Sequence, residues 1–243
     1  MQIIKLDATE STNVYLKELM GAISTPDFTI VVAADQRKGR GQMGTTWESE
    51  AGKNLTFSVL KILDDFKVDR QFELNICVSL AVYHALRYHQ IPDLYIKWPN
   101  DILSGDKKIG GILIENILSG PLLLSSVIGI GLNVNQISFG ELNRVSSLKL
   151  LTGRQFDLDG LLNILLDHLQ HYLGELKKMS IDGLWEEYEK ILFRKDRPST
   201  FQGLDGSHFP GIIKGVSPKG TLLVAIGDGE LREFGLKEVT LLY

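Results

Sequence analysis

Glycines and a cation are interleaved in a short segment of this sequence, residues 39–44, which reads Gly-Arg-Gly-Gln-Met-Gly. Glycines let the backbone approach a ligand closely, and the N–H groups that they leave exposed suit an anion. Arg40 adds a guanidinium group, which can bind a phosphate or a carboxylate through two parallel hydrogen bonds. The segment indicates a clasp for an anionic ligand, and a plain glycine-rich surface turn explains the spacing alone equally well.

Two known phosphate-binding patterns do not fit this segment. A Walker A loop requires Gly-x-x-x-x-Gly-Lys-Ser/Thr, which these residues do not provide. Gly39, Gly41 and Gly44 match the Gly-x-Gly-x-x-Gly spacing of a dinucleotide-binding loop, but that loop opens a helix. Here residues 45–52 lead into a strand-like run without helical periodicity, so the match is interpreted as accidental.

A lysine ends a later strand-like run, in the sequence Lys-Trp-Pro-Asn-Asp at residues 97–101. A lysine within a strand is rarely buried, so we expect Lys97 to face solvent or a ligand. Asn100 and Asp101 are good turn formers, and a simple turn is the favoured interpretation of this motif alone. In the functional interpretation, their oxygens bind a ligand or Mg²⁺.

Lysine and glycine open another apolar run, residues 108–115. Two glycines inside a strand weaken it, and they often mark a bulge or the close approach of a ligand. Lys108 stands at the start of this strand, where we expect it to point at that ligand; a charged strand end beside a bulge is the plainer alternative. Glu115 lies within the apolar run, where it can face solvent, pair with a lysine or reach a metal.

Other polar and reactive residues have simpler explanations. Residues 11–13, Ser-Thr-Asn, precede a helical pattern and suit a helix N-cap. His168 and His171 lie three apart on an expected helix without an evident third metal ligand, which favours a solvated face. Cys77 is the one cysteine, so no internal disulfide forms, and its apolar helical surroundings predict a buried structural thiol.

Composition limits the class of protein. The chain has 243 residues, 44% of them hydrophobic, which suffices for one large domain and a small one. Its net charge of -4 argues against broad nucleic-acid binding. Residues 1–5 lack the apolar core of a signal peptide, and the apolar runs are too short to span a bilayer. We therefore expect a soluble cytoplasmic protein that binds neither nucleic acid nor membrane.

The apolar periodicity predicts an α+β domain. Helical spacing predicts helices over residues 14–20, 71–88, 161–176 and 185–193. Apolar and β-branched runs predict strands over residues 28–34, 54–63, 94–98, 109–118 and 122–134. Because these elements do not alternate strictly as βαβ units, they favour a mixed, mostly antiparallel sheet with helices packed on it.

Beyond residue 198 the chain changes to short strand-like runs separated by glycine turns. The runs cover residues 211–216, 220–225, 231–234 and 239–242. This pattern predicts a small C-terminal β-barrel. We place the boundary near Arg194, which divides the chain into domains of residues 1–193 and 194–243.

Taken in order along the chain, these motifs resemble those of the biotin–protein ligases, or biotin–[acetyl-CoA-carboxylase] ligases. The matching segments are residues 11–13, 39–44 with Trp47, 52–60, 97–101, 108–115 and 129–135. Each motif is modest alone, but the ordered set is specific and covers nearly the whole chain. The resemblance implies a class II synthetase-like catalytic domain and a C-terminal SH3-like β-barrel.

The resemblance implies a two-step, AMP-forming reaction with biotin and ATP as substrates and Mg²⁺ as the activating ion. Biotin and ATP give biotinyl-5′-AMP and pyrophosphate. A lysine of a biotin carboxyl carrier protein then takes the biotinyl group and releases AMP. Some family members carry an N-terminal winged helix that binds DNA; this sequence starts almost directly at the Ser-Thr-Asn motif, so we expect no repressor activity. A monomer or a weak homodimer is expected.

The resemblance also assigns roles to individual residues. Lys108 and Arg40 match the residues that stabilise charge on the α-phosphate. The residues expected to bind biotin are Ser11, Thr12, Asn13, Gln36, Gly39, Arg40, Gly41, Gly111 and Leu113. The residues expected to bind ATP are Arg40, Gln42, Trp47, Lys97, Asn100, Asp101, Lys108 and Asn133. Asp101 is the expected contact for Mg²⁺, and residues 39–46 are expected to be mobile without ligand and ordered with it.

The glycine loop departs from the family at three positions. Gln42, Met43 and Thr45 stand where many members have basic residues. A less basic loop offers less charge to a bound phosphate. The departure therefore predicts that this chain holds the adenylate intermediate less tightly than its relatives do.

Three other functions compete with this interpretation. A lipoate–protein ligase or an octanoyl transferase shares the fold class, but the Arg-Gly loop and the Lys-Trp-Pro-Asn-Asp motif favour biotin. A non-catalytic biotin or nucleotide sensor is expected to lack the catalytic lysine, and Lys108 is present. An interaction module built on the C-terminal barrel is the third alternative, although that barrel more plausibly supports ATP binding and carrier docking.

Overall fold

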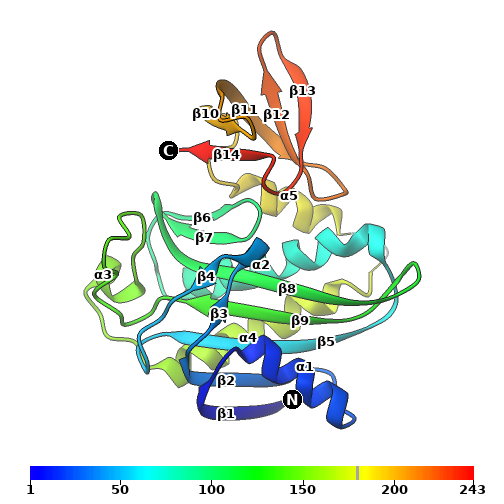
Figure 1. Cartoon of the computed structure of the whole chain (residues 1–243), viewed down its shortest axis with the longest axis vertical. Helices are drawn as coiled ribbons and strands as arrows, with labels where there is room; N and C mark the ends of the chain where they lie inside the picture. Colours follow the sequence, from blue (N-terminus) through cyan, green and yellow to red (C-terminus); the bar gives the residue numbers. More distant parts are fainter. Residues whose placement is uncertain (179–180) are drawn as a thin grey trace.

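A seven-stranded sheet forms the body of the molecule in the computed structural model, which describes residues 1–178 and 181–243 (Figure 1). The strand order is β1-β2-β5-β9-β8-β7-β6. The strands are β1 (Gln2–Thr9), β2 (Thr29–Gln36), β5 (Leu55–Lys67), β6 (Leu94–Lys97), β7 (Asp101–Ser104), β8 (Lys107–Ser119) and β9 (Leu122–Leu132). β1 and β2 run parallel, and the other neighbours in this sheet run antiparallel. The predicted mixed, mostly antiparallel sheet is confirmed.

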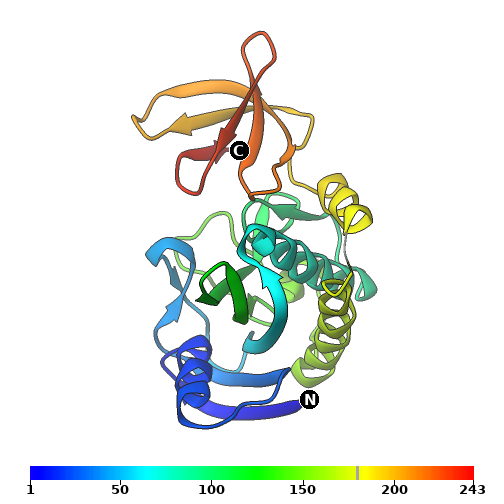
Figure 2. The same cartoon turned by 90° about the vertical axis from the view of Figure 1, so that its right-hand side faces the viewer.

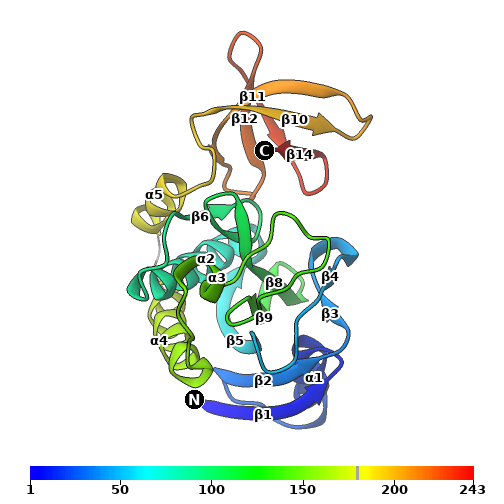
Figure 3. The same ribbon diagram turned by 90° about the vertical axis from the view of Figure 1, so that its left-hand side faces the viewer.

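Helices cover both faces of this sheet. α1 (Thr12–Ala22) lies on one face, and α2 (Gln71–Tyr88) and α4 (Leu158–Glu175) lie on the other (Figures 2 and 3). The connections hold α3 (Leu148–Thr152), α5 (Asp182–Lys190) and the 3-10 turns η1 (Gln42–Gly44) and η2 (Val68–Arg70). The helix predicted over residues 71–88 has the observed bounds, whereas α1 begins two residues before its predicted start and runs past Gly21. Within the described residues, no helix has the length and apolarity needed to cross a membrane.

Strand alternation gives the central strands two different faces. Toward α2 and α4 they present large buried apolar side chains, such as Phe57, Val59, Ile128 and Ile130. The face toward α1 carries a smaller cluster formed by Leu16, Val31, Leu60 and Val127. The main core therefore lies on the α2 and α4 side, which leaves room on the α1 side for a ligand.

Cys77 lies in the main core, on α2, as predicted for a structural thiol. Burial raises the pKa of this thiol to about 12, so the reactive thiolate is scarce at neutral pH. We expect iodoacetamide to leave Cys77 unmodified in the folded chain and to alkylate it in guanidinium chloride. Mass spectrometry of the chymotryptic peptides measures the alkylation of Cys77 under both conditions. Rapid alkylation of the folded chain would contradict this burial.

Four elements of at least four residues were not predicted from the sequence: β1, β7, α3 and β10 (Pro198–Gly203). Asn100 lies in the turn between β6 and β7, as interpreted, but Asp101 starts β7 because it pairs with Lys97 on one side and Gly111 on the other. Residues 105–106 form the tight turn that connects β7 to β8. β1, β7 and β10 are strands because each pairs with other strands, and local propensity does not contain that information.

The C-terminal residues form a five-stranded antiparallel sheet rather than a closed barrel. Its order is β13-β12-β11-β10-β14. After β10, the strands are β11 (His208–Val216), β12 (Leu222–Ile226), β13 (Glu230–Phe234) and β14 (Val239–Leu242). β13 and β14 are the two edges, and β13 is exposed along most of its length. The predicted small C-terminal β-domain of short strands is confirmed, and its outer strands β13 and β14 are not paired with each other.

The small sheet packs directly on the main body above β6 and β7 (Figure 1). Trp98 Nε1 donates a hydrogen bond of 2.9 Å to Gly220 O. A carboxylate oxygen of Glu189 accepts one of 3.0 Å from Val216 N. These contacts hold the small sheet against the β6 end of the main sheet.

Candidate active site

A cavity of about 350 Å³ opens on the α1 face of the main sheet. Its floor consists of small residues on adjacent strands: Thr56 pairs with Gly131, and Gly131 pairs with Gly111 in the same row. In the next row, Ser58 pairs with Gly129. Small side chains at alternate positions of one strand share a face, so these residues together hollow out the sheet. The volume lies within the range of small-molecule sites.

The N-terminus of α1 forms one end of this cavity. Ser11, Thr12 and Asn13 are buried there, beside Gln36 from the end of β2. The Gln36 side-chain carbonyl accepts the backbone N–H of Thr12 at 2.9 Å. Ser11 occupies the N-cap position, but its side chain makes no capping hydrogen bond, so capping does not account for this motif. This end offers several hydroxyl and amide groups to a polar ligand.

Polar side chains behind this end hold Asn13 in place. Asn13 Nδ2 donates to Glu115 Oε2 at 2.8 Å, and Ser58 Oγ lies 2.6 Å from Asn13 Oδ1. Glu115 also pairs with Lys17 at 2.7 Å. Partial burial acts to raise the pKa of Glu115, but the hydrogen bonds from Lys17 and Asn13 outweigh it and hold that pKa below its usual value. Glu115 is therefore an ionised carboxylate at neutral pH.

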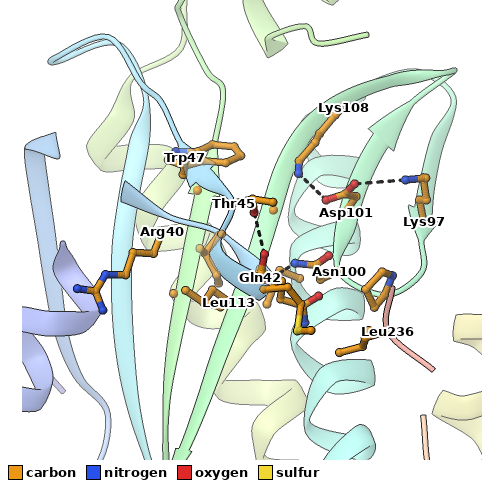
Figure 4. A pocket seen from close by; sticks show the side chains of 18 of the residues that line it. Arg40, Gln42, Thr45, Trp47, Lys97, Asn100, Asp101, Lys108, Leu113 and Leu236 are labelled. Atoms are coloured by element: carbon orange, nitrogen blue, oxygen red, sulfur yellow. Dashed lines mark hydrogen bonds and ion pairs between the residues drawn. The ribbon is translucent and has the colours of Figure 1, made fainter. Parts of the chain in front are cut away.

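Charged residues gather at the other end of the cavity (Figure 4). Lys108 Nζ lies 2.6 Å from Asp101 Oδ1, and Lys97 Nζ lies 3.6 Å from Asp101 Oδ2. Asn100 Nδ2 donates to Ile112 O at 2.7 Å and so fixes the chain between β6 and β7. The structure thus brings together the two lysines and the aspartate from separate sequence motifs. One carboxylate between two ammonium groups leaves a net positive charge for an anionic ligand.

The glycine loop forms a narrow ribbon, in which β3 (Gly39–Arg40) pairs with β4 (Thr46–Trp47). The Gly41 N–H donates to Thr45 O at 2.7 Å, so this amide is already engaged in the loop. The Arg40 side chain points away from Lys108 and Asp101 (Figure 4). A role for Arg40 at a phosphate therefore requires its side chain or the loop to move toward the lysines.

The tip of this loop contacts the small sheet. Met43 has a φ of 55°, and its carbonyl accepts a hydrogen bond of 3.0 Å from Lys237 Nζ. Leu236 and Lys237 also line the cavity. Lys237 was not predicted as a site residue, because nothing local in its sequence indicates a contact with residues almost two hundred positions earlier.

Trp47 covers the glycine floor. A Cβ atom on Gly131 would lie 2.4 Å from the indole ring, and one on Gly111 would lie 3.4 Å from it. The ring centroid is 5.7 Å from Lys108 Nζ. The indole Nε1 is buried without a hydrogen-bond partner. Trp47 therefore explains why these floor positions are glycine.

Fourteen of the sixteen predicted site residues line the cavity; Gly39 and Asn133 do not. A side chain on Gly39 would strike Trp47 O at 2.2 Å, so this glycine serves the pairing of β3 with β4. Asn133 donates to Ser146 O at 3.1 Å and keeps one buried oxygen, Oδ1, without a partner.

The sequence analysis also missed one aromatic residue, Tyr243, and one cationic residue, Arg144, near the lysines. The ring of Tyr243 lies 4.6 Å from the Arg144 guanidinium carbon and 5.3 Å from Lys97 Nζ. Burial raises the pKa of the Tyr243 phenol, and the charge of Asp101 acts in the same direction. Arg144 lies close to Tyr243 because the backbone of residues 144–146 is hydrogen-bonded to that of Lys108. No motif in the sequence marks either residue.

A hydrogen-bonding end and a cationic end within one cavity suit a small polar ligand that is joined to an anion. A family model described as "Biotin/lipoate A/B protein ligase family" matches residues 6–133. This segment contains α1, the glycine ribbon and the strands that form the cavity floor. The chain belongs to the biotin/lipoate A/B protein ligase family.

Individual relatives agree with this family. The chain is 30% identical over 239 residues to the bifunctional ligase/repressor BirA of Bacillus spizizenii, covering 93% of this chain and 70% of that protein. It is 29% identical over 228 residues to a biotin–[acetyl-CoA-carboxylase] ligase of Paracoccus denitrificans, covering 90% and 92% respectively. Among solved structures, the biotin protein ligase from Aquifex aeolicus in complex with biotin and ATP superposes with a TM-score of 0.82 at 29% identity, covering 99% and 98%.

Proposed function

We propose that this chain is a biotin–protein ligase, which activates biotin with ATP and transfers the biotinyl group to a lysine of a carrier protein. The observation that carries the proposal is the single cavity in which buried Thr12 and Gln36 lie at one end and Lys97 and Lys108 at the other. Biotin has a polar ring at one end and a carboxylate at the other, so it matches both ends. The relatives named for biotin ligation support the same function.

The first step joins the biotin carboxylate to the α-phosphate of ATP. A carboxylate oxygen forms a bond to the α-phosphorus, the bond from that phosphorus to the β-phosphate oxygen breaks, and pyrophosphate leaves. Two anions meet in this step, so Lys108 and Arg40 are proposed to offset their repulsion and the charge that develops on the α-phosphate. Holding both substrates in one cavity supplies much of the remaining acceleration.

The second step transfers the biotinyl group. The neutral amine of the carrier lysine attacks the acyl carbon of the mixed anhydride, the bond to the phosphate oxygen breaks, and AMP leaves with the electron pair. The amine loses a proton as the amide forms. Closure of the glycine ribbon over the anhydride is proposed to exclude water until the carrier arrives.

The residues predicted for ATP are proposed to keep that role at the cationic end. Lys97, Asn100 and Lys108 would contact the phosphates, and Trp47 would cover the adenine or order the ribbon. Among the described residues, no three His, Cys, Asp or Glu side chains gather into a metal site. Mg²⁺ usually enters such sites with phosphates and only one or two carboxylates, so Asp101 fits a Mg²⁺ that arrives with ATP and neutralises its phosphates.

The partner in the second step is a biotin carboxyl carrier protein. The net charge of -4 supports a protein partner rather than a nucleic acid. The small sheet contributes Leu236 and Lys237 to the cavity wall, which makes it a proposed docking element for the carrier. We propose a monomer or a weak homodimer as the working form.

Pyrophosphate release from Mg·ATP tests the proposed activity, with biotin and lipoate compared as substrates. We expect release that depends on biotin, and only background release with lipoate. Release with lipoate alone would assign the chain to lipoate ligation within the same family. No release with either substrate would support the sensor interpretation and contradict the ligase.

A further inference from the structure

The ribbon formed by β3 and β4 has little stability of its own. Residues 39–40 pair with residues 46–47, and isolated two-stranded ribbons are only marginally stable in water. The Trp47 ring fixes the base of the ribbon, because it packs on the glycine floor of the cavity. The tip, residues 42–44, extends beyond the paired residues toward the small sheet (Figures 1 and 2). The position of the tip therefore depends on what it contacts there.

Lys237 is the residue of the small sheet that meets this tip. Its Nζ donates a hydrogen bond of 3.0 Å to Met43 O. Lys237 lies in the turn between β13 and β14, where Glu238 N donates to Gly235 O at 3.3 Å and Glu238 Oε2 accepts the N–H of Gly235 at 2.6 Å. The small sheet is in turn hydrogen-bonded to the main body. The ribbon tip is thus connected to a turn that is itself held in place.

Both partners of this contact have a backbone conformation that their residue types rarely adopt. The φ angle is 66° at Lys237 and 55° at Met43. Glycine is the residue that turns prefer at positive φ, because it has no Cβ atom to clash. A glycine at position 237 would suit the turn but would remove the ammonium group. A lysine in a position that favours glycine therefore points to a function of its side chain.

The contact also brings positive charge to a ribbon that has little. Arg40 is the one lysine or arginine in residues 39–47, and its side chain points away from Lys108 (Figure 4). Lys237 lines the same cavity as Met43. An ammonium group has three N–H donors, so Lys237 can hold the Met43 carbonyl and still attract an anion in the cavity. Anchoring of the tip and attraction of a phosphate are therefore compatible in one side chain.

We propose that Lys237 is a positioning residue that anchors the tip of the glycine ribbon to the small sheet and so slows the escape of biotinyl-5′-AMP. The inference rests on the proposed function and deepens it. A tip held by Lys237 keeps the ribbon over the adenylate, whereas a released tip opens the cavity to water. The small sheet thus takes part in retaining the intermediate as well as in forming the cavity wall.

Three variants separate this role from a general effect of charge. Lys237→Met removes the ammonium group and keeps an unbranched side chain. Lys237→Arg keeps a cationic donor at the same position and is expected to preserve the anchor. Lys219→Met is the matched control, because Lys219 is an exposed lysine in the turn between β11 and β12 of the same sheet and does not line the cavity.

Hydrogen exchange of the ribbon amides, without substrates, tests the anchor itself. The N–H of Gly41 is hydrogen-bonded to Thr45 O at 2.7 Å, so its exchange reports opening of the ribbon. We expect exchange over residues 41–46 to become about 3- to 10-fold faster in Lys237→Met, as for the loss of one hydrogen bond. Lys237→Arg and Lys219→Met should exchange at the parent rate.

Release of labelled biotinyl-5′-AMP into a chase of unlabelled substrates tests the link to retention. We expect release to become about 3- to 10-fold faster in Lys237→Met and to remain at the parent rate in Lys237→Arg and Lys219→Met. The Kd for biotin without ATP should stay at the parent value in all three variants. A general loss of structure would weaken biotin binding too, and melting temperatures confirm that each variant is folded.

Parent-like exchange in Lys237→Met would overturn the anchor, and faster exchange with an unchanged release rate would overturn its role in retention. Equal effects of Lys219→Met and Lys237→Met would also overturn the inference, because the cause would then be net charge. Absence of adenylate formation by the parent chain would overturn the proposed function together with the retention role. Exchange, which needs no substrate, would still decide whether Lys237 anchors the ribbon, so the two failures are distinguishable.

Discussion

Replacing Lys108 by alanine is expected to lower the rate of biotinyl-5′-AMP formation by about 10²- to 10³-fold. Lys108 stands at the cationic end of the cavity, 2.6 Å from Asp101 and 5.7 Å from the Trp47 ring centroid. Without its ammonium group, the carboxylate of Asp101 faces the incoming phosphates with only Lys97 to balance it, at 3.6 Å. Single-turnover formation of the adenylate measures the effect directly.

The adjacent Lys107 provides the control for this substitution. Lys107→Ala removes the same charge from the first residue of β8, but its side chain is exposed and outside the cavity. We expect Lys107→Ala to retain the parent rate and both variants to keep the parent melting temperature. Unchanged adenylate formation in Lys108→Ala would rule out the role assigned to this lysine.

The second large effect is expected from Arg40→Gly, which should raise the rate at which biotinyl-5′-AMP leaves the protein by about 10- to 100-fold. A charge-assisted hydrogen bond contributes roughly 1.5 to 3 kcal/mol, and each 1.4 kcal/mol is about a tenfold change. The loop has few other cations to replace it, because residues 42, 43 and 45 are Gln, Met and Thr. The rate is measured by forming labelled biotinyl-5′-AMP on the protein and following its loss in a chase of unlabelled biotin and ATP.

The control for Arg40→Gly is Arg37→Ala. Arg37 is an exposed cation near the same ribbon that pairs with Asp35 at 3.2 Å and does not line the cavity. Its loss should leave the release rate unaltered. A release rate for Arg40→Gly equal to that of the parent would show that Arg40 stays directed away from the phosphates throughout the reaction, the direction it has in Figure 4.

The motifs that are defined by local sequence could be predicted, and their residues lie together in the structure as expected. The Ser-Thr-Asn segment, Gln36 and the two lysines come from four different elements, yet all line one cavity. The helix over residues 71–88 was also predicted with its observed bounds, because apolar spacing over five turns is a strong signal. Such features depend on residue type and spacing, which the sequence contains directly.

Features that depend on pairing across the sheet could not be predicted in the same way. Asp101 was interpreted as part of a turn, and only its pairing with Lys97 and Gly111 makes it the start of a strand. Ser58 lies within the strand predicted over residues 54–63 and was not singled out. Thr56 and Ser58 on that strand, and Gly129 and Gly131 on another, nevertheless repeat small residues at period two. That repeat is the signal that could have indicated a hollow on one face.

The small C-terminal sheet shows the same limit. Its short runs and glycine turns predicted several strands correctly, but not whether the outer strands close. β13 remains exposed as an edge, and β14 pairs with β10 at the opposite end of the sheet. Closure depends on strand tilt and on edge pairing, neither of which short apolar runs determine.

Transfer of biotin to a carrier lysine tests the central claim most directly. The chain would be incubated with Mg·ATP, biotin and a biotin carboxyl carrier domain, and the mass of the carrier would be measured before and after proteolysis. We predict the addition of one biotinyl group to a single lysine, dependent on ATP and absent when lipoate replaces biotin. A carrier that gains no biotinyl group while the chain remains folded, or a carrier modified only with lipoate, would contradict the account.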